Sequence, residues 1–162
     1  MPIDSRIDTA ALAYRQNGHL LAKGFEGLTT EEWLARPNQS TNPALWILGH
    51  LVWARSMALK LLGSPWERPW LPLFARGAKL PAPSEFPSPE EILLGWQEVS
   101  ANLAAALESA SDQALSAPAP EKSPSFDGKV SGMVTFLAFH EAYHVGQVSY
   151  LRRWLGHDQI VG

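Results

Sequence analysis

SGMVTFLAFHEAYHVGQVSYLRRWLG, residues 131–156, is the stretch that decides the fold. It is typical of one long helix, because its inward residues recur at steps of three and four. That seam consists of Met133, Leu137, His140, His144, Gln147, Leu151 and Trp154. Two histidines and a glutamine therefore occupy positions where a plain helical bundle places leucine. Residues four apart lie one turn apart on the same face, which is the spacing at which two imidazoles can bind one metal ion.

Helical periodicity extends over three further stretches, and no stretch shows the alternation expected of a strand. Ser88-Pro89-Glu90-Glu91 is a helix-start signal, and Gly63 is a typical helix terminator. A short capped turn is expected at residues 29–33. The main helices are expected from about residue 4 to 24 and beyond, from the N-cap Asn42 and Pro43 to 63, from 88 along a seam that reaches 110, and from about 131 to 156. We therefore predict an all-α fold, an up-and-down four-helix bundle that forms a single domain over residues 1–162.

The composition is that of an ordinary globular protein. Of its 162 residues 46% are apolar and 18% are charged, which is enough for one sizeable core and gives no sign of general disorder. The net charge is −3 and the basic residues are scattered, so no patch suits nucleic acid or an anionic membrane. The absence of cysteine excludes disulfides and thiolate metal sites. With no secretion signal and no apolar run long enough to span a bilayer, we expect a cytoplasmic protein without nucleic-acid or membrane partners.

A third histidine lies on the inward seam of the second helix. That seam consists of Ile47, His50, Ala54, Met57 and Leu61. An unpaired buried polar group costs about 1–3 kcal/mol, so three inward histidines in one core require a shared explanation. A metal ion provides one, because it binds a nitrogen lone pair on each ring. We predict that His50, His140 and His144 bind one divalent metal ion, whereas His19 and His157 are solvated or capping residues.

The expected topology also places the site. In an up-down-up-down bundle the second and fourth helices run in the same direction, and a small stagger then brings the three rings to one level. The site should open toward the starts of these two helices. That end carries the 29–42 and 112–130 loops, so the expected pocket-lining residues are Asn38, Gln39, Phe126 and Asp127.

The tryptophan-rich connection, residues 64–87, is expected at the opposite end of the bundle. It carries six prolines together with Trp66, Trp70 and Phe74. Connections of this length are usually functional or mobile. Because aromatic side chains usually stabilise by burial, we interpret the segment as additional core or as a dimer contact.

The run His140-Glu141-Ala142-Tyr143-His144 also matches the zinc-peptidase pattern H-E-x-x-H, in which the glutamate is the general base. The downstream residues of the metzincins are missing, because position 147 is glutamine and position 150 is tyrosine. No later glutamate could serve as a third ligand, and no strand is expected that would align a peptide. We keep a metallopeptidase only as an alternative.

Two further residues of the last helix are candidates for catalysis. Gln147 lies one turn beyond His144, where it can orient a metal-bound water or substrate, or hydrogen-bond a histidine or the helix backbone. Glu141 lies roughly 60° round the helix from His144, so it can reach the edge of the site as a base. The alternative for Glu141 is a place beside the ligands without contact to the metal, or at the surface.

The two histidine-bearing stretches resemble the signatures of a known family. Asn42-Pro43-Ala44-Leu45-Trp46-Ile47-Leu48-Gly49-His50-Leu51 resembles the second-helix signature of DinB-like metalloenzymes, and residues 140–156 resemble their last helix. The resemblance covers the whole chain in length and helix order. It implies a four-helix bundle with a nickel or zinc ion on His50, His140 and His144, and it implies a homodimer. Relatives include thiol-dependent transferases and isomerases that use bacillithiol, mycothiol or glutathione.

The ligand set leads to a functional hypothesis. Three neutral imidazoles leave at least one coordination position for water or substrate. An ion in such a site acts as a Lewis acid or lowers the pKa of a bound water or thiol. We therefore predict a metal-dependent enzyme of the thiol-dependent transferase or isomerase type, with a small-molecule substrate and a low-molecular-weight thiol as cosubstrate. The alternative from another class is a non-catalytic, metal-stabilised dimeric bundle, although a structural zinc site usually takes four protein ligands and no fourth is evident.

Overall fold

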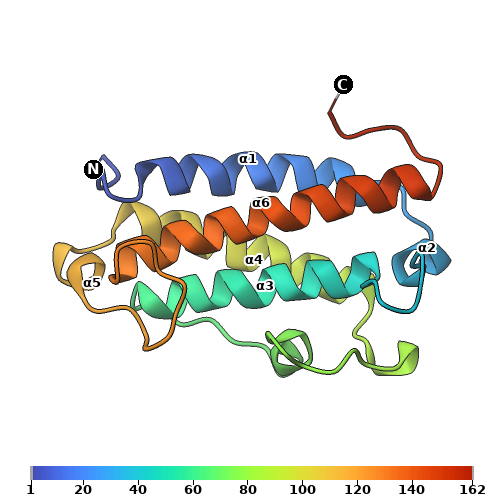
Figure 1. Cartoon of the computed structure of the whole chain (residues 1–162), viewed down its shortest axis with the longest axis horizontal. Helices are drawn as coiled ribbons and strands as arrows, with labels where there is room; N and C mark the ends of the chain where they lie inside the picture. Colours follow the sequence, from blue (N-terminus) through green and yellow to red (C-terminus); the bar gives the residue numbers. More distant parts are fainter. Residues whose placement is uncertain (1, 162) are drawn as a thin grey trace.

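The computed structural model describes residues 2–161, and within them every regular element is helical (Figure 1). The all-α bundle predicted from the sequence is therefore confirmed. The main helices are α1 (Asp8–Phe25), α3 (Ala44–Leu61), α4 (Pro89–Glu108) and α6 (Val130–Trp154). The shorter elements are α2 (Thr30–Leu34), η1 (Leu71–Phe74), η2 (Pro83–Glu85) and α5 (Asp112–Ser116). No helix in this part of the chain has both the length and the apolar character needed to cross a membrane.

The capping signals in the sequence form as expected at two helix starts. The Ser88 side chain accepts a hydrogen bond from the backbone N–H of Glu91, and Thr29 and Glu32 form a reciprocal capping box. The expected cap of the second main helix is wrong by one residue. Pro43, not Asn42, is the N-cap of α3, and no side chain caps that helix.

The first and last helices lie side by side and run in the same direction (Figure 1). Tyr14 donates a hydrogen bond to the carbonyl of Val134, and further along both helices Arg152 donates to the carbonyl of Glu26. Residue numbers therefore rise in the same direction on both helices, so α1 and α6 are parallel.

The direction expected for α3 relative to α6 is wrong. His50 lies beside His144, whereas Arg55, further along α3, bonds Glu141, which comes earlier on α6. Numbers rise on one helix while they fall on the other, so these two helices are antiparallel. Figure 1 shows α3 and α4 running in the same direction, so the order of directions is up, down, down, up. Periodicity identified most of the inward residues, although Trp154, expected on the inward seam of the last helix, is exposed. It carries no information on helix direction.

The parallel pair α3 and α4 explains the length of the tryptophan-rich connection. A chain that leaves the end of α3 must return along the whole bundle before α4 can begin (Figure 1). On the way it buries Trp70 and Phe74 in the core. The interpretation of this segment as additional core is confirmed, and its expected place at one end of the bundle is wrong.

The centre of the bundle contains an ion pair. Arg55 on α3 donates from Nε and Nη2 to the two carboxylate oxygens of Glu141 on α6, each at 2.7 Å. Its guanidinium also donates to the carbonyl of Tyr14 on α1 and to the hydroxyl of Ser100 on α4. Arg55 is 4% exposed and Glu141 is fully buried. One arginine thus joins all four main helices.

We expect Glu141→Ala to lower the free energy of unfolding by about 3–5 kcal/mol, because it leaves the Arg55 charge buried without its partner. Denaturant unfolding of metal-free protein measures this. Glu121→Ala, in an exposed loop, is the matched control and should change stability by less than about 0.5 kcal/mol. Equal stability of the two variants would show that the ion pair does not hold the bundle together.

Candidate metal centre

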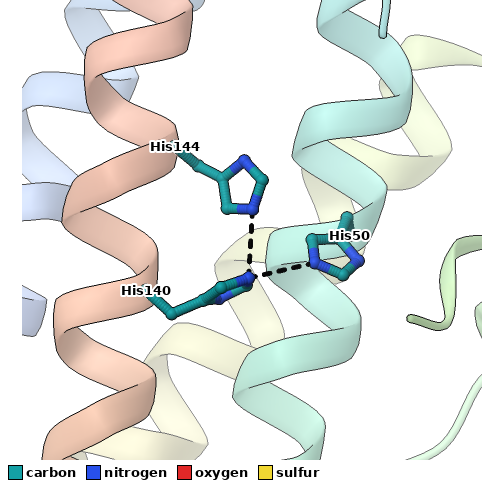
Figure 2. A group of neighbouring side chains, drawn as sticks. All are labelled: His50, His140 and His144. Carbon is teal, nitrogen blue, oxygen red and sulfur yellow. Dashed lines mark hydrogen bonds between the residues drawn. The ribbon is translucent and has the colours of Figure 1, made fainter. Parts of the chain in front are cut away.

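The three histidines predicted as metal ligands lie together between α3 and α6, with their rings directed at one point (Figure 2). The Nε2 atom of His140 lies 3.2 Å from that of His50 and 3.1 Å from that of His144. One nitrogen from each ring lies within 4.8 Å of the other two. The juxtaposition expected from the two helix seams is therefore present.

Two of the three separations between these nitrogens are those of ligands sharing one ion, and the third lies within 4.8 Å. Tetrahedral zinc with bonds of about 2.0–2.1 Å places its ligand nitrogens roughly 3.3 Å apart. Octahedral coordination at the same bond length places neighbouring ligands roughly 3.0 Å apart. The observed separations of 3.2 and 3.1 Å lie between these values. These two separations do not distinguish nickel from zinc.

Burial keeps the imidazoles in the neutral form that binds metal. His50 and His144 are 5% and 6% exposed, and His140 is half-buried. Desolvation lowers the pKa of all three rings, and it lowers the pKa of His140 and His144 to about 4. The neighbouring histidines and then Arg76 lower the His140 pKa further. At neutral pH each ring therefore has a lone pair available.

Groups around His50 fix its orientation. The carbonyl of Phe74 can only accept, so Nδ1 of His50 carries the hydrogen of their 2.7 Å bond. That assignment leaves Nε2 with a lone pair directed at the other histidines. The rings of Trp46 and Trp53 stack on His50, with centroids 4.8 and 5.3 Å away. The imidazole is therefore held in place by contacts that do not involve a metal.

Gln147 performs the same role for His144. Its amide oxygen lies 2.7 Å from Nδ1 of His144, so that nitrogen donates and Nε2 again keeps its lone pair. Of the two roles predicted for Gln147, the hydrogen bond to a histidine is the one observed. The same side chain also lines a pocket, so its contact with a substrate stays a prediction.

The hydrogen bonding of His140 shows whether the three histidines fit a metal ion. The Nε2 lone pairs of His50 and His144 both face the Nε2 atom of His140, and one hydrogen on that atom can satisfy only one of them. The other ring nitrogen of His140, Nδ1, is buried without a hydrogen-bond partner. A metal ion resolves the conflict between the Nε2 atoms, because it accepts all three lone pairs; Nδ1 of His140 then carries the hydrogen, still without an acceptor among the described residues. The donor set therefore fits a divalent ion.

Both carboxylate oxygens of Glu141 are bonded to Arg55. The alternative that placed it at the surface is wrong, because its side chain is fully buried. The general base of an H-E-x-x-H peptidase faces the metal-bound water. With its carboxylate committed to Arg55, Glu141 does not form that arrangement here.

A cavity of about 490 Å³ opens beside the histidines, between the start of α3 and the second half of α6. It is lined by Pro37, Ser40, Thr41, Asn42, Ile47, Tyr143, Gly146, Gln147, Tyr150 and Leu151. Gln147 connects it to the site, since its amide contacts both the cavity and His144. None of the lining side chains carries a charge at neutral pH.

The expected pocket-lining residues are wrong in detail. The 29–42 loop does contribute to the cavity, but through Pro37 and residues 40–42 and not through Asn38 or Gln39. Asp127 instead caps the start of α6, where it accepts from the backbone N–H of Gly132, and Phe126 packs on Phe136. The antiparallel direction of α6 places its start far from the start of α3, which explains the difference.

Two residues that support the histidine site, Phe74 and Arg55, were not predicted from the sequence. Phe74 acts through its backbone carbonyl, which has no signature in a sequence. Arg55 did have a signal: before Lys60 it is the one charged residue of a helix that is otherwise apolar almost all round. Such a residue requires a buried partner of opposite charge.

Gly49 should be essential for holding His50. A Cβ added there would lie 2.4 Å from the Phe74 ring, so Gly49→Ala must displace Phe74 and with it the carbonyl that orients His50. We expect metal affinity to fall by about 10–100-fold. Isothermal titration with zinc measures it. Gly18→Ala is the control, because a Cβ at Gly18 meets only the tip of Arg55 at 3.8 Å. Unchanged zinc affinity in folded Gly49→Ala would remove the role assigned to Phe74.

The histidine pKa values predict how the stability of metal-free protein depends on pH. The folded chain binds protons at His140 and His144 only near pH 4, whereas the ordinary histidine pKa is 6.5. Between these values the unfolded chain binds more protons, so stability is greatest above pH 6.5 and falls as the pH drops toward 4. Urea unfolding midpoints measured from pH 7 to 4.5 test this. The decline should be shallower in His140→Gln/His144→Gln than in the control His19→Gln; equal slopes would contradict the assignment.

Comparison with known proteins agrees with this geometry. A family model described as the DinB superfamily matches residues 13–148, which include all three histidines and run from Ala13 within α1 to Val148 within α6. No curated protein and no solved structure gives a significant match. The match covers most of the chain, and the helical bundle and the histidine cluster agree with it. The chain belongs to the DinB superfamily.

Proposed function

We propose that the protein is a metal-dependent enzyme that acts on a small molecule in the cavity beside His144. The observation that carries this proposal is the convergence of the Nε2 atoms of three histidines, two of them oriented by Phe74 and Gln147. His50, His140 and His144 would hold one nickel or zinc ion. When bound, the ion supplies a Lewis acid with an open coordination position, where the pKa of a thiol or water is lowered.

The protein's own groups have separate tasks in this proposal. The histidines bind the ion in neutral form, and the tryptophans around His50 exclude water from one side of the site. The cavity has the size of a small-molecule site, for which about 300–1,000 Å³ is typical. Hydroxyl and amide groups from residues 40–42 and from Gln147 line it and can orient a polar ligand.

We propose a reaction of the thiol-dependent transferase or isomerase type. The support is family membership together with a site able to bind a thiol as thiolate. The absence of charged side chains from the cavity lining favours one class of thiol cosubstrate over the others. Because no lining side chain is charged, an uncharged thiol such as mycothiol fits better than bacillithiol or glutathione, whose carboxylates would lose hydration without gaining a partner.

A homodimer is part of the proposal. Four large side chains on α6 are exposed: Phe139, Tyr143, Tyr150 and Trp154, at 62, 61, 62 and 46%. Their spacing of four, seven and four keeps them on one face of the helix. An exposed aromatic stripe is typical of an interface between proteins. Because Tyr143 and Tyr150 also line the cavity, a second copy docked there would cover its rim.

Elemental analysis and thiol assays test the function together. We expect about one equivalent of nickel or zinc in the native protein, and a loss of both metal and turnover in His50→Ala/His144→Ala of at least about 100-fold, because two of three ligands are gone. His19→Ala, with an exposed histidine on α1, should match the native protein. Mycothiol should support faster turnover of electrophiles than glutathione or bacillithiol.

The possible outcomes separate the metal site from the reaction. A native protein that binds neither ion after dialysis against both would overturn the metal centre. Bound metal without turnover of any thiol would overturn the reaction type and leave the site. Removal of the ion from a catalytic site should leave the bundle folded, whereas unfolding on removal would support the alternative of a metal-stabilised, non-catalytic module.

A further inference from the structure

A second cavity, of about 640 Å³, lies between α1 and α4, the pair of neighbouring main helices that pack least closely. None of the three histidines lines it, and it shares no lining residue with the cavity between α3 and α6. It is therefore separate from the metal centre.

The floor of this groove is formed by Arg55. Its guanidinium stacks on Trp96, with the central carbon 3.9 Å from the ring centroid, and it is 4% exposed. On the α1 side Gly18 places no side chain over it, and an added Cβ there would meet only Nη2 of Arg55, at 3.8 Å. The arginine that joins the four helices is thus also the deepest polar group of the groove.

Arg55 retains an unused donor. A guanidinium has five N–H groups. Within residues 2–161, Glu141 accepts two of them, and the Tyr14 carbonyl and the Ser100 hydroxyl accept one each. The fifth belongs to Nη1, the nitrogen that bonds Ser100 at the wall of the groove. A buried donor without an acceptor costs stability, and a ligand that supplies an acceptor relieves that cost.

The groove has a polar end and an apolar end. The polar end is lined by Arg15, Gln97, Ser100 and Arg55. The apolar end, toward the start of α1, is lined by Ile3, Ala11, Leu103 and Leu107. A ligand that matches both ends has one polar head and one apolar tail.

The charged residues of the groove indicate that the polar head of the ligand is an anion. Arg15 lines the groove and takes part in none of the ion pairs among the described residues. The one acidic lining residue, Glu108, follows Leu107 at the apolar end. We propose that this groove is a binding site for a single-chain carboxylate, with the carboxylate at Arg15 and the unused N–H of Arg55, and the alkyl chain along Ala11, Leu103 and Leu107.

Isothermal titration with decanoate below its micelle concentration tests the site. The comparison probe is decyltrimethylammonium, which has the same chain and the opposite charge. We expect one decanoate per chain, bound at least about tenfold more tightly than the cation, as expected for a head group at a partly buried arginine. Arg15→Gln should weaken decanoate by about threefold, in line with a solvent-exposed charge. Equal affinity for the two probes would overturn the proposal.

Variants that fill the groove locate the binding. Gly18→Leu covers Arg55 and should abolish decanoate binding, whereas Gly18→Ala adds one methyl group and should retain it. Ala104→Trp, at an exposed lining position, is a second filling variant if Gly18→Leu does not fold. His50→Ala/His144→Ala should bind decanoate like the native protein. Binding that survives both filling variants, or that disappears with the metal ligands, would assign decanoate to another site and overturn the proposal.

Discussion

The bidentate ion pair between Arg55 and Glu141 fixes how α3 lies against α6, and the histidine cluster depends on that register. The two helices are antiparallel, so a slip of one turn would move His50 by about 5.4 Å relative to α6 and separate it from its partners. A bidentate arginine–carboxylate contact tolerates no such slip, because its two parallel hydrogen bonds require a planar match. The apolar contacts between α3 and α6 are less selective. The buried charges therefore specify the alignment that apolar packing alone leaves open.

The second constraint is the return of the chain from α3 to α4. Because these helices are parallel, the connection must run along the bundle, and it passes α3 at the level of His50 (Figure 1). Gly49 lets the Phe74 ring pack directly against the α3 backbone, which places the Phe74 carbonyl 2.7 Å from His50. A feature that serves topology thus also orients a candidate ligand. The burial of Phe74 in the core makes that carbonyl a rigid acceptor.

Much of this organisation could be predicted from the sequence, and the limits have physical causes. The helices and their starts follow from 3–4 periodicity and capping residues such as Ser88, which are local signals. The histidines stood out because they replaced leucine on two inward seams. The direction of α3 relative to α6 could not be obtained in this way, since a seam looks the same in either direction. Because that direction was unknown, the pocket was expected at residues such as Phe126 and Asp127.

The role of Glu141 was ambiguous for a related reason. Its position beside His140 is compatible with the metal face or the core, and only its partner Arg55 decides between them.

The division of polar groups on α6 bears on why the protein would hold a metal at all. Glu141 bonds Arg55 in the centre of the bundle and fastens α6 there, while His140 and His144 face His50 of α3 and Gln147 lines the cavity. In a structural site the ion itself orders its ligands, and the surrounding fold depends on it. Here a carbonyl, an amide and stacked indoles already orient two of the three rings, and an ion pair elsewhere sets the helix register. Preorganisation of this kind contributes little to folding, but it lets a bound ion keep an open position without rearranging its ligands, which is a requirement of chemistry.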